Sequence, residues 1–382
     1  MSRARPIRLG MIGGGAGAFI GAVHRFASRL DGHYQLLAGA LSSSPERARE
    51  SGAALGLSEG RIYDTYQDMA VAEAARADGV EAVAIVTPNH MHFAPAKAFL
   101  QAGIHVICDK PLTSTIEDAE ALAKIAAKAN ALFILTHNYT GYPMVRQARE
   151  MVQSSTLGAL RVIQAEYAQD WLTESIETEG QKQAAWRTDP ARSGAGGAIG
   201  DIGTHAFNLL RFVTGLRVGE LAADLSSFGP GRALDDNANI MLRFDSGARG
   251  HLWASQVAPG NENGLRLRIY GDKGGLEWAQ EDPNRLWYTP FGEPKRLLTR
   301  NGAGALDAAT RISRIPPGHP EGYLEGFANL YSEAAIAIRA FQTGSAIPPE
   351  VHFPTLEDGL EGMRFIEAAV KSSSANAGWV AL

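Results

Sequence analysis

The stretch IRLGMIGGGAGAFIG, residues 7–21, decides the fold of the N-terminal part of the chain. An apolar run at its start is followed by a glycine-rich loop. Gly13, Gly15 and Ala18 fit G-x-G-x-x-G/A, in which the first glycine turns the chain, the second admits a pyrophosphate and the third permits close helix packing. Phe19 and Ile20 then open a helix whose free N–H groups can bind phosphate. The stretch therefore predicts a strand, a phosphate-binding loop and a helix.

The segments that follow repeat the alternation of strand and helix. This context matters, because a glycine pattern alone is a weak signal in a chain with 42 glycines. Four further apolar runs alternate with helical stretches, and these runs lie at residues 36–41, 80–86, 105–108 and 132–135. Such alternation is typical of a parallel, doubly wound sheet. We therefore expect an α/β protein in which residues 1–138 form a Rossmann dinucleotide-binding domain.

The pattern changes after residue 138. Apolar strands now follow one another without intervening helices, at residues 160–167, 221–228, 239–244, 250–256, 265–270 and 275–278. Leu265, Leu267 and Ile269 alternate with arginines, as in a strand with one buried face. We expect residues 139–382 to form a C-terminal α+β domain with a large, mostly antiparallel open-faced sheet. One face would pack on helices, and the other is a candidate oligomer surface.

The end of the second strand carries no acidic residue at the position that binds the ribose of NAD. Ser42, Ser43 and Arg47 stand there instead. They can accept a 2′-phosphate or hydrogen-bond a plain ribose, so the sequence leaves NAD and NADP open. The same residues can equally cap and solvate the next helix, at 45–55.

The ends of the later parallel strands would face the ligand crevice. One end carries Thr87, Pro88 and Asn89, and another carries Asp109 and Lys110. A lysine at such a place can hydrogen-bond a substrate oxygen and lower the pKa of that hydroxyl by its charge. A surface or helix-capping lysine is the alternative interpretation.

A second motif, SGAGGAIGDIGTHAFN, covers residues 193–208. The apolar spacing after it predicts a helix that begins near Asp201. Asp201 and His205 would then lie one turn apart on one face, a geometry that suits an acid–base pair. The glycines before them let backbone or ligand approach closely, because no side chain stands in the way.

A long polar segment lies between Trp171 and residue 190. Long irregular segments in compact domains are often functional. Trp186 can stack on a sugar face and Arg187 can grip an anion or hydroxyls, although a tryptophan can equally anchor the loop to the core. Later in the chain, His319 can point into the site or merely cap a helix.

Composition excludes several classes of protein. A net charge of −5 without a Lys/Arg cluster argues against nucleic-acid binding. The single cysteine, Cys108, excludes an internal disulfide and a multi-cysteine zinc site, and we expect no metal. The chain has no secretory signal pattern and no apolar run that approaches the roughly 18 residues of a membrane span. We expect a cytoplasmic protein without a membrane partner.

Together these motifs resemble the Gfo/Idh/MocA oxidoreductases, over nearly the whole chain. The resemblance is carried by the glycine loop, by the Thr-Pro-Asn triplet with His92, by Asp109-Lys110-Pro111, and by the glycines that lead to Asp201 and His205. It implies a Rossmann domain and a C-terminal domain whose open sheet forms a homodimer or homotetramer. The chain departs from the family where Asp109 replaces the more common Glu, where the glycine loop is longer, and where Asn208 replaces an acid.

The resemblance also implies a site. Lys110, Asp201 and His205 would surround the substrate carbon that exchanges hydride with nicotinamide. The residues expected to bind NAD or NADP are Gly13, Gly15, Ala18, Phe19, Ile20, Ser42, Ser43, Arg47, Thr87, Pro88, Asn89, His92, Asp109, Lys110 and Asn138. Those expected to bind a sugar-like substrate are Lys110, Tyr139, Trp171, Trp186, Arg187, Asp201, His205 and His319.

The leading hypothesis is an NAD(P)-dependent dehydrogenase that acts on a secondary hydroxyl of a sugar, polyol or sugar derivative. His205 would take the hydroxyl proton, Asp201 would orient His205 or share the proton, and Lys110 would stabilise the alkoxide. One alternative is an oxidoreductive glycosidase that oxidises its sugar transiently, with Arg187 and Lys182 as grips for an anionic glycoside. A non-catalytic dinucleotide-binding sensor is another.

Overall fold

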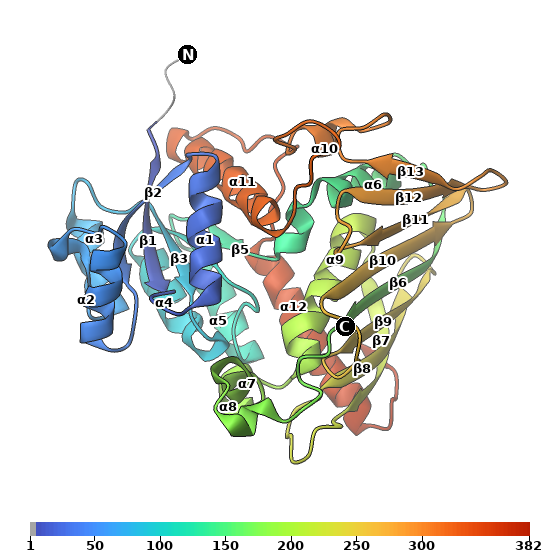
Figure 1. Cartoon of the computed structure of the whole chain (residues 1–382), viewed down its shortest axis with the longest axis horizontal. Helices are drawn as coiled ribbons and strands as arrows, with labels where there is room; N and C mark the ends of the chain where they lie inside the picture. The colour runs from blue at the N-terminus through green and yellow to red at the C-terminus, as the bar shows by residue number, and fades with distance from the viewer. Residues whose placement is uncertain (1–4) are drawn as a thin grey trace. The chain divides into compact units, whose positions relative to one another are not determined.

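A five-stranded parallel sheet follows from the N-terminal alternation, in a computed structural model that describes residues 5–382 (Figure 1). Its order is β2-β1-β3-β4-β5. The strands are β1 (Ile7–Gly13), β2 (Tyr34–Ala40), β3 (Ala82–Val86), β4 (His105–Cys108) and β5 (Phe133–Leu135). Every residue of β3, β4 and β5 is buried, as expected for strands covered on both faces. The predicted doubly wound sheet is confirmed.

Helices connect these strands. They are α1 (Phe19–Leu30), α2 (Pro45–Ala54), α3 (Tyr66–Ala75), α4 (Phe93–Gln101) and α5 (Ile116–Ala126). Three of them begin at a hydroxyl side chain that accepts a hydrogen bond from the backbone N–H three residues later, at Ser44, Thr65 and Thr115. Such caps satisfy N–H groups that have no partner within the helix, so they fix where each helix starts.

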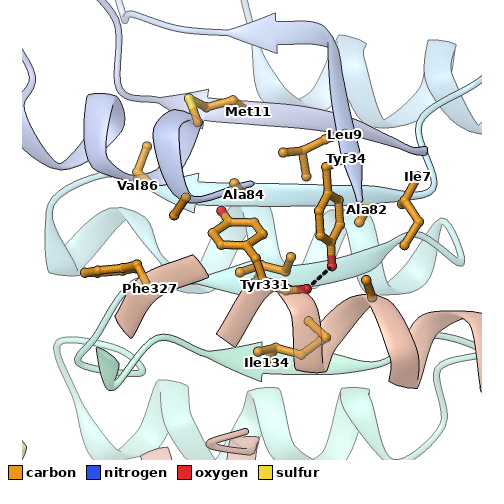
Figure 2. Packing of buried hydrophobic residues seen from close by; sticks show 14 of the residues in the cluster. Ile7, Leu9, Met11, Tyr34, Ala82, Ala84, Val86, Ile134, Phe327 and Tyr331 are labelled. Atoms are coloured by element: carbon orange, nitrogen blue, oxygen red, sulfur yellow. Dashed lines mark hydrogen bonds between the residues drawn. The ribbon is translucent and has the colours of Figure 1, made fainter. Parts of the chain in front are cut away.

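A late helix, α11 (Tyr323–Thr343), completes the core of this unit. Figure 2 shows its Phe327 and Tyr331 against residues of the parallel sheet. The hydroxyl of Tyr34 donates to the backbone carbonyl of Tyr331 at 3.0 Å, and the Tyr331 hydroxyl lies 2.8 Å from His24 Nδ1. Residues up to Gly141 and Tyr323–Leu360 therefore form one compact unit. The expected ranges 1–138 and 139–382 do not describe this return of the chain to the first sheet.

The second unit comprises Tyr142–Gly322 and Glu361–Leu382. Its sheet has nine strands in the order β13-β12-β11-β10-β6-β9-β8-β7-β14. Only β6 and β9 pair in parallel, so the expected mostly antiparallel sheet is confirmed. The strands are β6 (Leu160–Ala168), β7 (Val218–Ser226), β8 (Asn237–Phe244), β9 (Arg249–Ser255), β10 (Gly264–Gly271), β11 (Gly274–Ala279), β12 (Arg285–Pro290), β13 (Arg296–Thr299) and β14 (Val380–Ala381). The sequence patterns did not indicate β12, β13 or β14.

Leu265, Leu267 and Ile269 are buried on one face of β10, as predicted from their alternation with arginines. The helices of the second unit include α9, which carries the second motif. Their bounds are α6 (Pro143–Gln153), α7 (Lys182–Arg187), α8 (Pro190–Ser193), α9 (Thr204–Thr214) and α10 (Asp307–Thr310), with α12 (Leu356–Ser374) shared between the two units. No helix of residues 5–382 is long and apolar enough to cross a membrane.

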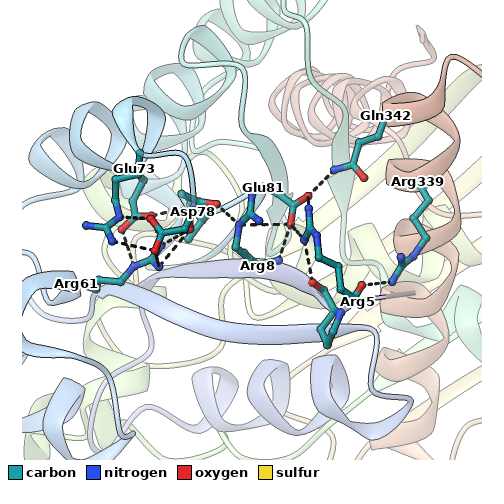
Figure 3. Close-up of polar contacts among 12 residues, drawn as sticks. Arg5, Arg8, Arg61, Glu73, Asp78, Glu81, Arg339 and Gln342 are labelled. Carbon is teal, nitrogen blue, oxygen red and sulfur yellow. Dashed lines mark hydrogen bonds and ion pairs between the residues drawn. The ribbon is translucent and has the colours of Figure 1, made fainter. Parts of the chain in front are cut away.

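Ion pairs stabilise the segments that precede β1 and β3 (Figure 3). Arg61 pairs with the fully buried carboxylate of Glu73, which also accepts from the Val80 N–H at 2.9 Å. Glu81, just before β3, accepts hydrogen bonds from the Arg5 guanidinium and from the Arg8 N–H. Burial raises the pKa of Glu81, but these hydrogen bonds outweigh burial and lower it to about 2. This edge of the sheet lies opposite the carboxyl ends that would meet a cofactor.

Three buried histidines of the first unit predict a loss of stability in acid. Burial lowers the pKa of His24 and of His105 to about 4, and that of His137 to about 3. The unperturbed pKa of histidine is 6.5. Between pH 6.5 and pH 4 the unfolded chain therefore binds more protons than the folded chain does. The free energy of unfolding should therefore decrease across this window, by about 3 kcal/mol for each histidine.

Denaturant titrations at a series of pH values test this expectation. His105 Nδ1 accepts a hydrogen bond from the Leu132 N–H at 2.9 Å, and the oxygen of an asparagine can replace that nitrogen. His105→Asn should therefore flatten the decline, whereas the exposed His90→Asn should leave it unchanged. An identical decline in His105→Asn and wild type would contradict the assignment.

Candidate functional site

The glycine loop turns at the carboxyl end of β1. Gly13 has a φ of +74°, and a Cβ placed on it would lie 2.8 Å from Thr87 Cγ2 at the end of β3. A side chain there would be strained and would close the gap between these strand ends. The Gly15 N–H donates to the Leu41 carbonyl at 3.2 Å, which fixes the loop against the end of β2. Gly14 and Gly15 are buried, whereas Ala16 and Gly17 of the loop are exposed near the strand end where a pyrophosphate would lie.

Close packing between the helix and the loop occurs at Gly21. A Cβ on Gly21 would lie 2.4 Å from Gly14 Cα, so helix and loop touch at this residue. Ala18 is the N-cap of α1 and offers no capping side chain, and Phe19 is 70% exposed. The loop is longer than the simple pattern, so Gly21 makes this contact, and the role of Ala18 stays a prediction. The N–H groups of the first turn of α1, which includes Ile20, remain suited to a phosphate.

Gly21→Ala should lower both stability and dinucleotide affinity, because the added methyl group displaces the loop from the helix. Overpacking of this kind costs about 1–3 kcal/mol. The measurements are thermal unfolding and titration of NADH fluorescence. Gly60→Ala is the matched control, since a Cβ at Gly60 meets nothing within 4 Å. Equal affinity and stability in the two variants would contradict the contact.

The residues after β2 include the helix cap. Ser44 caps α2 by accepting from the Arg47 N–H at 3.4 Å, and Ser42 Oγ accepts from the Ser44 N–H at 3.2 Å. The cap of α2 is therefore Ser44, and not Ser42 or Ser43 as the capping interpretation expected. The Ser43 and Arg47 side chains are exposed beyond the strand, where a ribose or a 2′-phosphate would bind.

His92 links the turns that follow β3 and β4. It is fully buried, with Nδ1 2.8 Å from the Pro111 carbonyl and Nε2 2.8 Å from the Thr87 carbonyl. Burial lowers the pKa of His92. Both ring nitrogens thus face main-chain oxygens, so His92 positions the turns with Pro88 and Asn89 and offers no nitrogen to a cofactor.

Lys110 begins the turn after β4, and its peptide bond to Pro111 is cis. Its N–H lies 3.0 Å from Asp109 Oδ1, which also accepts from Thr136 Oγ1 at 3.0 Å. Asp109 therefore holds the backbone of this turn, a task for which the shorter acid suffices. The Lys110 side chain is partly buried at the carboxyl edge of the sheet.

The residues after β5 add a polar group that fits a ligand. Asn138 is 2% exposed, and its Nδ2 has no hydrogen-bond partner within residues 5–382. A buried donor without a partner costs free energy, so a bound carbonyl or phosphate oxygen would stabilise it. Next to it, burial and the charge of Lys110 lower the pKa of His137 to about 3, and Tyr139 is buried. This orphaned donor and the open glycine loop fit a dinucleotide.

The second motif forms a π-helical turn, Ile199–Gly203, that continues into α9. The Thr204 N–H bonds to the Ile199 carbonyl, five residues earlier. Asp201 lies within this turn, so it precedes α9 and does not begin a regular helix as predicted. The wider turn changes the angle between Asp201 and His205, and π-turns are frequent at functional sites.

Asp235, just before β8, anchors the glycines of this motif. Its carboxylate accepts from the Gly197 N–H at 2.7 Å and from the Ile199 N–H at 2.8 Å. A Cβ on Gly197 would lie 2.0 Å from the Asp235 carbonyl oxygen, so this position requires glycine. Burial raises the pKa of Asp235 to about 6, although the two hydrogen bonds favour its charged form.

The Asp201 carboxylate has two side-chain partners on one oxygen. Asp201 Oδ2 accepts from Arg187 Nε at 3.1 Å and from Gln256 Nε2 at 2.9 Å. Arg187 lies over the ring of Trp186, 4.3 Å from its centroid, and 6.0 Å from that of Trp171. Arg187 and the two tryptophans, predicted to bind substrate, thus form one cluster beside Asp201.

His205 is buried on α9, with 8% exposure, and its ring centroid lies 6.2 Å from that of Tyr167. The Tyr167 hydroxyl donates to Asn263 Oδ1 at 2.7 Å, which fixes the aromatic neighbour of the imidazole. Asn208, one turn after His205, is 6% exposed, and its Oδ1 has no partner in the described part of the chain. The motif therefore places an imidazole and an open acceptor on one helix.

His319 is exposed, and its main-chain carbonyl accepts from the buried guanidinium of Arg300 at 2.5 Å. The suggestion that the His319 side chain points into the site stays a prediction. Within residues 5–382, no group of three or more His, Cys, Asp or Glu side chains is placed to hold a metal ion.

Sequence patterns missed four residues that shape these sites: Gly21, Ser44, Asp235 and Gln256. Gly21 lies in the stretch that decides the fold, and its spacing from Gly14 could have indicated that the helix packs on the loop at this residue. Ser44 precedes a proline and was recognisable as a cap. Asp235 and Gln256 gave no local signal, because their roles arise from contacts across the sheet.

Comparison with known proteins matches both halves of the chain to models of oxidoreductase domains. The model of an oxidoreductase family with an NAD-binding Rossmann fold matches residues 7–137, and that of the GFO/IDH/MocA C-terminal domain matches residues 145–277. An uncharacterised oxidoreductase of Bacillus subtilis (strain 168) is 35% identical over 384 residues, which cover 99% of this chain and 97% of that protein.

Solved structures extend the comparison. An oxidoreductase from Sinorhizobium meliloti is 60% identical, with a TM-score of 0.90 over 99% of this chain and 100% of the other. An inositol dehydrogenase homologue from Azotobacter vinelandii, in complex with NAD+, is 37% identical, with a TM-score of 0.96 over 100% and 98%. Its complex with NADH and myo-inositol is 36% identical, with a TM-score of 0.93 over 99% and 98%. The chain belongs to the Gfo/Idh/MocA family of NAD(P)-binding oxidoreductases.

Proposed function

We propose that this oxidoreductase transfers hydride between the nicotinamide of NAD or NADP and a secondary hydroxyl carbon of a polyol or neutral sugar. The observation that supports the proposal is that Asp201, within the π-helical turn, pairs with Arg187 and precedes the buried His205 by four residues. A charged carboxylate near an imidazole is the arrangement that general base catalysis on a hydroxyl requires.

Each residue has one task in the proposed reaction. When bound, the nicotinamide supplies the hydride chemistry. His205 accepts the hydroxyl proton at an imidazole nitrogen, since imidazole titrates near neutral pH. Asp201 orients the ring and stabilises its charged form, and the Lys110 ammonium stabilises the negative charge that develops on the substrate oxygen. Asn138 donates its amide to the bound dinucleotide.

Charge favours a neutral substrate over an anionic glycoside. Arg187 is the residue expected to bind an anion, and its Nε lies 3.1 Å from Asp201 Oδ2. The Asp201 carboxylate therefore already compensates the positive charge of Arg187. The homologue bound to NADH and myo-inositol supports a polyol as the first substrate to test.

The test is to incubate the purified protein with NAD or NADP and a panel of inositols, aldoses and glycosides. We expect NADH or NADPH to appear with at least one neutral polyol or sugar. Cleavage of a glycoside without net reduced cofactor would favour the oxidoreductive glycosidase, and tight dinucleotide binding without any turnover would favour the sensor.

The outer face of the nine-stranded sheet supports assembly into a homodimer or homotetramer. Val162, Met241 and Trp287 are exposed on strands of this sheet, at 41%, 51% and 40%. Exposed apolar side chains on one sheet face are typical of protein interfaces. Light scattering of the purified protein measures the number of subunits.

A further inference from the structure

Asp201 is held more firmly than its place in a glycine-rich segment suggests. Its Oδ2 accepts from Arg187 Nε and Gln256 Nε2, at 3.1 and 2.9 Å. The Asp201 side chain is only 15% exposed and that of Arg187 only 24%. Partly buried charge pairs are screened less by water and salt than exposed pairs. The carboxylate therefore has a defined direction and a compensating charge.

The Arg187 guanidinium is itself fixed by neighbours on α7 and by aromatic rings. Its Nη1 donates to Gln183 Oε1 at 2.5 Å, and its plane lies over Trp186. Gln183 Oε1 also accepts from the Trp186 indole at 3.2 Å, so these three side chains hold one another. A planar guanidinium suits this stacked, directional arrangement, whereas a lysine ammonium would supply charge alone.

Gln256 approaches Asp201 from the end of β9. It is 2% exposed, its N–H donates to the Asp236 carbonyl at 2.8 Å, and its carbonyl accepts from the Leu172 N–H at 3.0 Å. These main-chain hydrogen bonds fix the position of Gln256 at the end of the sheet, and with it the position of its side-chain amide. Asp201 is thus fixed from two directions, by a cation on α7 and by a neutral donor on the sheet.

We propose that Arg187 is a positioning residue that acts through Asp201, keeping the carboxylate ionised and directed while His205 exchanges the substrate proton. Arg187 then contributes to catalysis without binding the substrate itself. The inference rests on the proposed dehydrogenase function. Other ionisable groups near this turn are His205 on α9 and Asp235, which bonds to the Gly197 and Ile199 N–H groups.

This role has a signature in the pH dependence of turnover. Without the Arg187 charge, the Asp201 carboxylate is no longer compensated and stabilises the charged form of the His205 imidazole more strongly, so the imidazole is protonated at higher pH. In Arg187→Gln, the acid limb of the kcat/KM profile should move to higher pH by about one unit. At alkaline pH the variant should recover most of the wild-type kcat. The kcat/KM profile of Arg187→Lys should lie between those of the wild type and Arg187→Gln, because lysine retains the charge but not the planar geometry.

Matched variants separate this role from the alternatives. Arg192→Gln removes the same charge from α8, has no contact with Asp201 among those described, and should keep the wild-type profile. A loss of activity in Arg187→Gln that is equal at all pH values would indicate a purely structural role. A raised KM with an unshifted acid limb would indicate direct substrate binding. Either result overturns the inference, and a thermal unfolding curve equal to that of wild type shows that the variant is folded.

A double variant tests whether the effect of Arg187 depends on Asp201. Once Asp201 is replaced by Asn, Arg187→Gln should cause no further shift of the acid limb and less than about a two-fold change in kcat/KM. A full additive loss would show that Arg187 acts independently of Asp201. Absence of turnover in the wild type would count against the proposed function, whereas an active wild type with an unshifted Arg187→Gln profile would count against this inference alone.

Discussion

We expect Lys110→Ala to lower kcat for the proposed polyol oxidation by about 10²–10³-fold, the usual cost of removing one donor to a developing oxyanion. Lys110 begins a turn whose backbone is held by Asp109 and His92, so its ammonium would be in position before the substrate oxygen becomes negative. Since that charge appears during the reaction, kcat should fall more than KM rises. Steady-state kinetics over a range of substrate concentrations measures both.

Two comparisons make this expectation specific. Lys97→Ala removes an exposed lysine from α4 of the same unit and should leave kcat unchanged. NADH affinity of Lys110→Ala, measured by fluorescence, should stay within about two-fold of wild type if the turn remains folded. A Lys110→Ala enzyme with full turnover would remove Lys110 from the proposed chemistry.

His205→Asn removes the proposed proton acceptor and should lower kcat by about 10²–10⁴-fold near neutral pH. The imidazole is nine-tenths buried against Tyr167, so bulk water cannot replace it freely. At alkaline pH, hydroxide can take over part of the proton transfer. The loss should therefore diminish as the pH rises, and the acid limb attributed to the imidazole should disappear from the pH profile.

His251→Gln supplies the control in the second unit. His251 lies on β9, is exposed and is paired in register with Gln164 on the neighbouring strand. Its replacement should leave the profile intact. If His205→Asn kept the wild-type acid limb, the proton acceptor would have to be another group.

The first sheet was predictable because its signals are local. Buried parallel strands produce continuous apolar runs, and the turn at Gly13 needs a residue that tolerates positive φ. The position of α11 was not predictable in the same way. Its amphipathic pattern identifies a helix, but contacts of Tyr331 with Tyr34 and His24, about 300 residues away in sequence, decide which sheet it covers.

The candidate site was predictable as a set of residue types and less so as a geometry. Asp201 and His205 were recognised by their motif, but apolar spacing does not distinguish a π-helical turn from a regular helix. Arg187 was recognised as a functional cation, and its pairing with Asp201 depends on how α7 folds back onto the π-turn. Polar partners from distant strands, such as Gln256, leave no periodic trace in the sequence.

Transfer of deuterium tests the central claim most directly. The purified enzyme is incubated with NAD or NADP and with myo-inositol that carries deuterium on every carbon, and the reduced cofactor is analysed by mass spectrometry. Hydride transfer from a hydroxyl-bearing carbon predicts one deuterium in each reduced cofactor, and slower turnover than with unlabelled substrate where this step limits the rate. If inositol is not a substrate, the labelled form of whichever polyol or sugar is active takes its place. Reduced cofactor without deuterium, or no reduction with any polyol or sugar, would contradict the account.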